Sequence, residues 1–549
     1  MSYAPGSPPS GVRTVKKPIE GEVRNGRIYR VPDDCKTVEE AIGLAGDGDC
    51  VFIAPGIYEV TEPMMVTKDI YIMGVDETGE CAVLKMNGGR LRPALPIIRF
   101  DTAKSHIKGV QFDFSYDKEL AASGADAKSF ALLVVTGFVV MDEVSITSDT
   151  GGIRCAPGSH TTLVCSRITT ARSGVAIEGT AFLDRSTFMG CASGVEVHAD
   201  PACSAKVEGC CFSQCGVGVS CVGRGSVRCE RSAFVDGTHV GVRLINSGLS
   251  SPTASLIRSN EFRGVAHKGV EVGGDGCSVT VSKNFIHSLG KEVVGACGVH
   301  VAGGRPEIQT NVIQSCPNGP GILCTGGTPL IESNVVEECA VGIHIRSARP
   351  MVRLNEITSS KVSGVLVESA QLPLLGVYRS GPDDTRPSAH VDDPNTSGFV
   401  NPMNEADPHV EANVMTDNQR NICVYSCTGT FLKNELTVTA DDNVVLDGPQ
   451  SVAVVVSGNV IGGSIKGACV LLSNKVEARV QGNEMRGAQQ AAVVMRGCGF
   501  SEVQRNTGDE CQGGVTAMGG AVGRISGNVF GTGMEIEIFS DSQATVAVV

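Results

Sequence analysis

Residues 255–302 read SLIRSNEFRGVAHKGVEVGGDGCSVTVSKNFIHSLGKEVVGACGVHVA and carry one pattern twice. Asn260 and Asn284 are each followed two residues later by an apolar residue, and further on by Gly-Val-x-Val, which begins at Gly269 and at Gly298. Alternation of apolar residues with period two predicts a strand that turns every second side chain toward the core. Helical periodicity is missing, so each copy is predicted to be two or three short strands joined by turns.

The Asn of this pattern, which we call the Asn mark, recurs along most of the chain. Its positions are Asn260, Asn284, Asn311, Asn334, Asn355, Asn413, Asn434, Asn459, Asn483, Asn506 and Asn528, preceded by Ser166, Ser186, Cys210 and Ser232. A unit of this size cannot bury its inner face alone, whereas stacked units can. We therefore expect an all-β fold, a parallel β-helix of roughly 18 coils in which the Asn side chains stack and hydrogen-bond at one turn.

Three segments are expected. Residues 1–30 are rich in Pro and basic residues and predict a flexible tail. Residues 31–82 predict an N-terminal cap, because Thr37-Val-Glu-Glu40 has the spacing of a helix capping box and precedes apolar residues at helical spacing. Residues 83–549 predict the β-helix, interrupted at about 371–409 by an acidic, Pro-rich loop.

Composition narrows the classes of function. The 549 residues have a net charge of −13, which opposes nucleic-acid binding, and the longest apolar run is too short to span a bilayer. The N-terminus has no secretory pattern, and the 22 cysteines lack zinc-site spacing, so we expect reduced, mostly inward thiols in the cytoplasm. We expect no metal, no cofactor, no nucleic acid and no membrane partner.

Residues 37–59, TVEEAIGLAGDGDCVFIAPGIYE, resemble the opening of pectin-lyase-like right-handed parallel β-helix proteins, and the Gly-Val-x-Val and Asn-x-Ile units resemble their repeats. The resemblance covers residues 31 to 540. It implies a right-handed single-stranded β-helix. The superfamily contains polysaccharide lyases, esterases and hydrolases, and also intracellular relatives without enzymatic activity, such as the β-helix of an F-box substrate receptor and the Shc-binding spindle proteins.

The outward residues of the Gly-Val strands are where the carbohydrate-active relatives carry catalytic groups. In this chain the column runs Ala176, Glu196, Ser220, Arg243, Glu271, His300, Leu323, His344 and Leu366. Glu271 and His300 are predicted to lie on neighbouring coils, within hydrogen-bonding reach. With His344 they are the candidate catalytic residues, and the alternative is a mixed, solvated face.

Two functions of different classes remain. The signatures of polygalacturonases and pectate lyases are absent, and Phe188, Phe212, Phe234 and Phe262 fall in inward positions, so no sugar platform is evident. We therefore expect a non-enzymatic intracellular scaffold that presents long faces to protein partners, in the cytoplasm and in a cytoskeletal setting such as spindle or cilium. The alternative is a carbohydrate-active enzyme, a polysaccharide lyase, esterase or hydrolase.

Overall fold

The computed structural model describes residues 26–74, 80–87, 95–115, 129–245, 255–290, 293–369, 406–449, 451, 453–531 and 536–549. The chain divides into two compact units, Met1–Ser186 and Thr187–Val549, which are considered one at a time. Of the predicted tail at 1–30, only 26–30 lie among the described residues, and there a strand begins at Ile28. Of the predicted loop at 371–409, only 406–409 are described.

The first unit opens with the predicted cap. Helix α1 (Val38–Leu44) begins after Thr37, whose Oγ1 accepts a hydrogen bond from the backbone N–H of Glu40 at 3.2 Å. The Glu40 carboxylate accepts in return from the N–H of Lys36 at 2.9 Å. The first contact confirms Thr37 as the N-cap, whereas the Glu40 side chain reaches one residue further back than in a capping box, to Lys36 instead of Thr37. In the described part of the chain, no helix combines the length and apolarity needed to cross a membrane.

The strands of the first unit are β1 (Ile28–Val31), β2 (Cys50–Ile53), β3 (Gly56–Glu59), β4 (Met64–Val66), β5 (Tyr71–Met73), β6 (Ala82–Asn87), β7 (Ile98–Lys108), β8 (Val110–Ser115), β9 (Phe130–Asp142), β10 (Ser145–Ser148), β11 (Gly151–Cys155), β12 (His160–Val164), β13 (Arg167–Thr170), β14 (Ser173–Ile177) and β15 (Thr180–Asp184).

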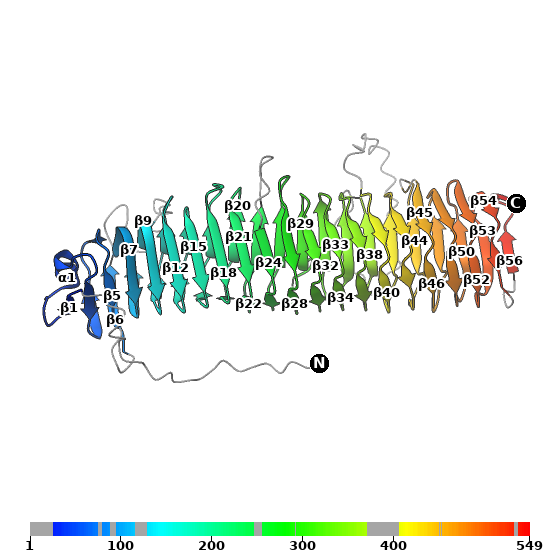
Figure 1. Cartoon of the computed structure of the whole chain (residues 1–549). Helices are drawn as coiled ribbons and strands as arrows, with labels where there is room; N and C mark the ends of the chain where they lie inside the picture. The colour runs from blue at the N-terminus through cyan, green and yellow to red at the C-terminus, as the bar shows by residue number, and fades with distance from the viewer. Residues whose placement is uncertain are drawn as a thin grey trace. The chain divides into compact units, whose positions relative to one another are not determined.

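The second unit repeats a coil of three strands, and like strands of successive coils pair in parallel (Figure 1). Face 1 consists of β17 (Ser193–Val197), β20 (Val217–Val222), β23 (Val240–Ile245), β26 (Lys268–Gly273), β29 (Cys297–Ala302), β32 (Pro320–Gly326), β35 (Val341–Arg346), β38 (Ser363–Glu368), β41 (Ile422–Tyr425), β44 (Val444–Asp447), β47 (Val470–Ser473), β50 (Ala491–Arg496), β53 (Gly513–Met518) and β56 (Ile536–Ser540).

Face 2 consists of β18 (Ser204–Glu208), β21 (Ser226–Glu230), β24 (Ser255–Arg258), β27 (Val279–Ser282), β30 (Glu307–Gln309), β33 (Leu330–Glu332), β36 (Met351–Arg353), β39 (His409–Glu411), β42 (Thr430–Leu432), β45 (Val454–Ser457), β48 (Ala478–Gln481), β51 (Ser501–Gln504), β54 (Val522–Ser526) and β57 (Thr545–Val548).

Face 3 consists of β16 (Thr187–Met189), β19 (Cys211–Ser213), β22 (Ala233–Val235), β25 (Glu261–Arg263), β28 (Phe285–His287), β31 (Val312–Gln314), β34 (Val335–Glu337), β37 (Glu356–Thr358), β40 (Val414–Thr416), β43 (Glu435–Leu436), β46 (Val460–Gly462), β49 (Glu484–Arg486), β52 (Thr507–Asp509) and β55 (Val529–Phe530). About 19 turns are described, against roughly 18 expected, and the prediction of an all-β parallel solenoid with one short N-terminal helix is confirmed.

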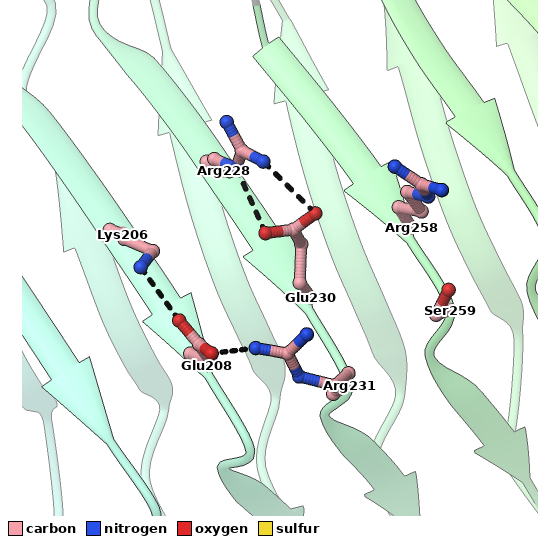
Figure 2. A pocket seen from close by; sticks show the side chains of 7 residues that line it. All are labelled: Lys206, Glu208, Arg228, Glu230, Arg231, Arg258 and Ser259. Carbon is pink, nitrogen blue, oxygen red and sulfur yellow. Dashed lines mark hydrogen bonds and ion pairs between the residues drawn. The ribbon is translucent and has the colours of Figure 1, made fainter.

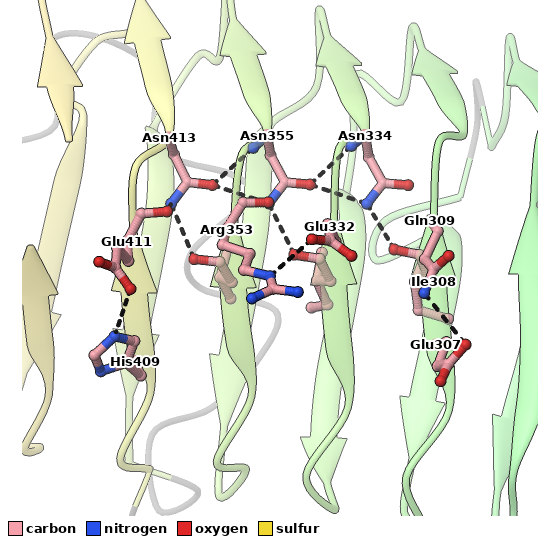
Figure 3. A network of polar contacts seen from close by, with 12 residues as sticks. Glu307, Ile308, Gln309, Glu332, Asn334, Arg353, Asn355, His409, Glu411 and Asn413 are labelled. Carbon is pink, nitrogen blue, oxygen red and sulfur yellow. Dashed lines mark hydrogen bonds and ion pairs between the residues drawn. The ribbon is translucent and has the colours of Figure 1, made fainter. Parts of the chain in front are cut away.

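The Asn mark sits at the turn between faces 2 and 3. Asn355 donates from its backbone N–H and from Nδ2 to Oδ1 of Asn413, both at 2.9 Å, so the register continues across the long interval between these residues (Figure 3). The residue before the mark has a left-handed backbone, as in Leu354 with φ 57°. A non-Gly residue pays about 1 kcal/mol for that conformation, and the buried amide ladder offsets it.

Close packing explains the Gly that begins each Gly-Val unit. A Cβ on Gly218 would stand 2.5 Å from the ring of Phe234 and 2.6 Å from the carbonyl oxygen of Gly241 on the next coil. Phe234 is fully buried and stacks on its neighbours Phe212 and Phe262 at 4.8 and 4.7 Å. Only Gly leaves room for this column of rings, and the prediction that these aromatic residues face inward is confirmed.

The cysteines behave as small apolar residues. All 22 are free, and all but Cys81, Cys165 and Cys211 are buried. Burial raises the pKa of Cys221 to about 12 and that of Cys50 to about 11, which keeps these two thiols protonated and unreactive. The prediction of mostly inward thiols is confirmed.

Candidate functional site

The predicted outward column of face 1 exists, but it is divided into an open and a covered part. Strand pairing places Arg243 beside Glu271, and Glu271 beside His300. The column then continues through buried side chains, of which Leu366 is 0% exposed. The prediction of a solvated face is therefore wrong beyond His300. Period two decides whether a side chain points outward, and it does not decide whether other chain segments cover it.

The open part carries a cluster of five polar side chains, which we call the Glu271 cluster: Arg243, Lys268, Glu271, His300 and Thr325. Arg243 Nε donates to Glu271 Oε2 at 2.6 Å, and Lys268 Nζ donates to Oε1 at 2.5 Å. The imidazole of His300 lies next to the same carboxylate, with Nδ1 3.4 Å from Oε1. Strands β23, β26 and β29 supply the first four members and β32 supplies Thr325, so four successive coils build the cluster.

The hydrogen bonds assign a tautomer to His300. Lys268 Nζ lies 3.0 Å from His300 Nδ1, and because an ammonium group can only donate, Nδ1 accepts while Lys268 is in this position. The proton of the neutral ring is then on Nε2, which lies 3.0 Å from Thr325 Oγ1. Thr325 Oγ1 donates in turn to the carbonyl oxygen of Val301 at 3.4 Å. The only basic lone pair of the ring thus points toward Lys268 and Glu271.

The electrostatics of the cluster favour a permanent carboxylate. The contact with His300, when the ring carries a proton on Nδ1, followed by the contacts with Lys268 and Arg243, holds the pKa of Glu271 well below its usual range. Glu271 is therefore an anion at any ordinary pH and a poor proton donor, but it is well placed to stabilise a positive charge on the neighbouring imidazole. The side chains of Glu271 and His300 are 12% and 13% exposed, so solvent or a ligand reaches them.

His344 does not join the cluster. Strand β32 separates it from His300, and its Nε2 lies 3.0 Å from Oε1 of Glu368, which Arg346 approaches at 3.2 Å. His344 is fully buried beside an apolar group that includes Leu366. The structure brings together two of the three sequence candidates, Glu271 and His300, and leaves His344 apart.

Sequence reasoning did not single out three members of the cluster. Arg243 stood in the column without a role, whereas Lys268 and Thr325 were not considered. Lys268 immediately precedes the Gly of its Gly-Val unit, an outward position at the strand's beginning, and that position was the available signal. Thr325 comes from the next coil, where the register between β29 and β32 shifts after Val301, and no spacing rule anticipates such a shift.

The fold agrees with a known family. The family model for the right-handed β-helix region matches residues 132–286 and 249–372, the coils that include the Glu271 cluster. Residues 132–372 thus match the right-handed β-helix region, in agreement with the parallel strand pairing of these coils. Residues 383–544 match a second family model, the periplasmic copper-binding protein NosD. No curated protein matches the chain.

Solved structures of similar fold come from carbohydrate-active proteins. The periplasmic alginate epimerase AlgG is 13% identical, with 76% of this chain and 80% of that chain covered and a TM-score of 0.31. A PL6 family polysaccharide lyase of Pseudopedobacter saltans is 10% identical, with 71% and 84% covered and a TM-score of 0.30. The A-module of the mannuronan C-5 epimerase AlgE6 of Azotobacter vinelandii is 12% identical, with 89% and 92% covered and a TM-score of 0.17. Similarity at this level assigns no residue and no substrate to this chain.

These matches correct the predicted function and location. The expectation of an intracellular scaffold in the cytoplasm, at a spindle or cilium, is wrong, because the family matched by residues 383–544 is periplasmic. The prediction of a reducing compartment rested partly on the number of cysteines. Thiols buried in a solenoid core are protected wherever the protein is, so their number says little about location.

The described part of the NosD-like region has no group of His, Cys, Asp or Glu side chains that could hold copper. Cys469 and Cys511 are the thiol pair there, both buried, and the hydrogen bond with Cys511 helps to raise the pKa of Cys469. Copper sites need further N or S ligands around such a pair. Among the described residues, no three His, Cys, Asp or Glu side chains form a group that could hold a metal ion.

Proposed function

We propose that the chain is a carbohydrate-active enzyme that acts outside the cytoplasm on polysaccharides containing uronic acids, with the Glu271 cluster as its catalytic centre. The observation that carries the proposal is the contact of one carboxylate with two cations and an imidazole on an open stretch of face 1. This is the combination of groups that abstraction of a proton next to a sugar carboxylate requires.

Each side chain has a role in that reaction. Arg243 and Lys268 are 37% and 27% exposed and can exchange part of their pairing with Glu271 for the carboxylate of a bound uronate. Neutralising that carboxylate acidifies the adjacent C5–H bond. When Lys268 turns to the substrate it leaves Nδ1 of His300, whose lone pair then accepts the C5 proton. Glu271 stabilises the imidazolium that results.

The electron pair left at C5 has two outcomes. It can expel the oxygen substituent at C4 as a double bond forms between C4 and C5, with water protonating the leaving oxygen, which cleaves the polymer. Alternatively, a proton from water returns to C5 from the opposite face, which inverts the carbon. Both outcomes share the first step, so the proposal concerns proton abstraction and leaves the product to experiment.

The test is exchange and cleavage on two uronate polymers, alginate and polygalacturonate, with the full chain. We expect the wild type to incorporate deuterium from heavy water at C5, or to release unsaturated ends. His300→Ala should slow this by about 10²-fold to 10⁴-fold, the usual contribution of a general base. His409→Ala is the matched control, because His409 also contacts a carboxylate, Glu411 at 3.3 Å, but lies on face 2 outside the cluster.

Two results would overturn the proposal. One is a wild-type protein that neither exchanges C5 protons nor cleaves either polymer. The other is an active His300→Ala protein with the rate of the wild type. Retained secondary structure by circular dichroism in both variants ensures that the comparison reports chemistry rather than unfolding.

A further inference from the structure

Face 2 contains a cleft of ≈ 470 Å³ that the proposed chemistry does not use. Its lining comes from three successive coils, from β18, β21 and β24 and the turns that follow them (Figure 2). We call it the arginine cleft. The residues that line it are Lys206, Glu208, Arg228, Glu230, Arg231, Arg258 and Ser259.

Strand register arranges the charges of the arginine cleft in two rows. Lys206 pairs with Arg228 in one row, and in the next row Glu208 pairs with Glu230, which pairs with Arg258. Parallel strands are about 4.8 Å apart, so the charges recur at that spacing along the face. A ligand whose charges repeat at a similar spacing could contact several of these side chains at once.

The cations stand outside the carboxylates. Lys206, Arg228 and Arg231 are 48%, 55% and 65% exposed, whereas Glu208 and Glu230 are 19% and 12% exposed. Arg228 holds Glu230 with two hydrogen bonds, at 2.9 and 3.3 Å, and thereby lowers the pKa of that carboxyl. The carboxylates position the cations from below, and the surface that a ligand meets is positive.

The balance of charge in the cleft is positive although the chain is acidic. Four cations (Lys206, Arg228, Arg231 and Arg258) against two carboxylates leave +2, while the whole chain carries −13. Among the described residues, the side chain of Arg258 acts on Glu230 through its charge without a hydrogen bond, and Figure 2 shows its guanidinium apart from both carboxylates. An exposed guanidinium with five donors is the group that binds carboxylate or sulfate best.

We propose that the arginine cleft binds anionic polysaccharide, through carboxylate or sulfate groups spaced along the chain, as a docking site separate from the catalytic centre. The Glu271 cluster is on face 1 and the cleft on face 2, so one polymer chain held in the cleft would deliver other segments to the cluster. This inference rests on the proposed function for its biological meaning, but binding at the cleft can be measured whether or not turnover occurs.

The experiment measures binding of fluorescent alginate and of fluorescent dextran sulfate to the full chain, at low and at moderate salt. The double variant Arg228→Ala/Arg258→Ala should bind about tenfold more weakly. Glu230→Gln removes a buried negative charge and should bind about twofold to fivefold more tightly, with both effects reduced by salt. Arg479→Ala is the control, because Arg479 is also 55% exposed and paired with one carboxylate on face 2, but in a balanced pair with Glu502.

The outcomes separate the alternatives. Equal binding by the wild type, the double variant and Glu230→Gln would overturn the inference. So would stronger competition by single-stranded DNA than by alginate, because it would identify a nucleic-acid surface. A preference for dextran sulfate or for alginate distinguishes sulfate from carboxylate recognition. The assay measures binding and not turnover, so loss of binding in the double variant stands even if no turnover is found.

Discussion

Replacement of Asn311 by Ala tests whether the asparagine ladder holds the coils together. Asn311 is fully buried. Its Nδ2 donates to the carbonyl oxygen of Val281 and to Oδ1 of Asn334, both at 2.9 Å. Its Oδ1 accepts from the backbone N–H of Asn284 at 3.1 Å and from Nδ2 of Asn284 at 2.9 Å. Alanine removes all four bonds and leaves buried donors and an acceptor without partners.

The expected loss follows from these bonds. At about 1 kcal/mol for each, Asn311→Ala should lower the free energy of unfolding by about 4 kcal/mol. Asn311→Ser should lose about half as much free energy of unfolding, because Ser occupies the equivalent position in earlier coils. Ser232 Oγ accepts from the N–H of Cys210 at 3.1 Å and donates to the carbonyl oxygen of Glu230 at 3.0 Å.

The assay combines urea unfolding with hydrogen exchange. Because repeat arrays can unfold in parts, exchange of the Asn284 amide is the more local readout, and it should lose protection in Asn311→Ala before the amides of distant coils do. Gln309→Ala is the control on the same coil, since its amide donates only to Glu307 at an exposed site. Unfolding within about 1 kcal/mol of the wild type, with a protected Asn284 amide, would refute the ladder as a source of stability.

Two further outcomes are expected. Cys165 is the one exposed thiol, so in the native protein it should react with a thiol reagent far faster than the buried thiols, and close to 22 thiols should titrate after unfolding. Cys165→Ser should abolish the fast phase of the reaction. Several fast-reacting thiols in that variant would contradict the burial of the other cysteines. The pKa of Glu271 in the folded protein is lowered below the ordinary glutamate value of 4.5, so the contribution of this carboxylate to stability is present above about pH 4.5 and is lost as pH falls through the lowered pKa. Glu271→Gln should therefore be less stable at neutral pH and lose less of its urea resistance as pH falls. If urea resistance falls in parallel with pH in the two proteins, the Glu271 carboxylate does not stabilise the fold in this way.

Sequence periodicity was sufficient for the fold because a β-helix repeats one local rule. The Asn and Gly marks set the length of each coil, and the residue two places after each Asn set its inward face. Register then followed, so the adjacency of Glu271 and His300 could be predicted without coordinates, and the structure places the two side chains in contact. The ladder could be predicted for the same reason, since equivalent residues of stacked coils must meet.

The outer surface was decided only by the tertiary structure. His344 and Leu366 occupy outward positions by period, yet both are fully buried, because whether an outward side chain is covered depends on segments remote in sequence. The contact of Lys268 with His300 and the position of Thr325 depend on side-chain direction and on a local register shift. The arginine cleft likewise arises where cations from three coils stand above recessed carboxylates. Alternation along one strand determines which way a residue points. A site needs residues from several coils at particular distances, and these distances are fixed only when the coils pack together.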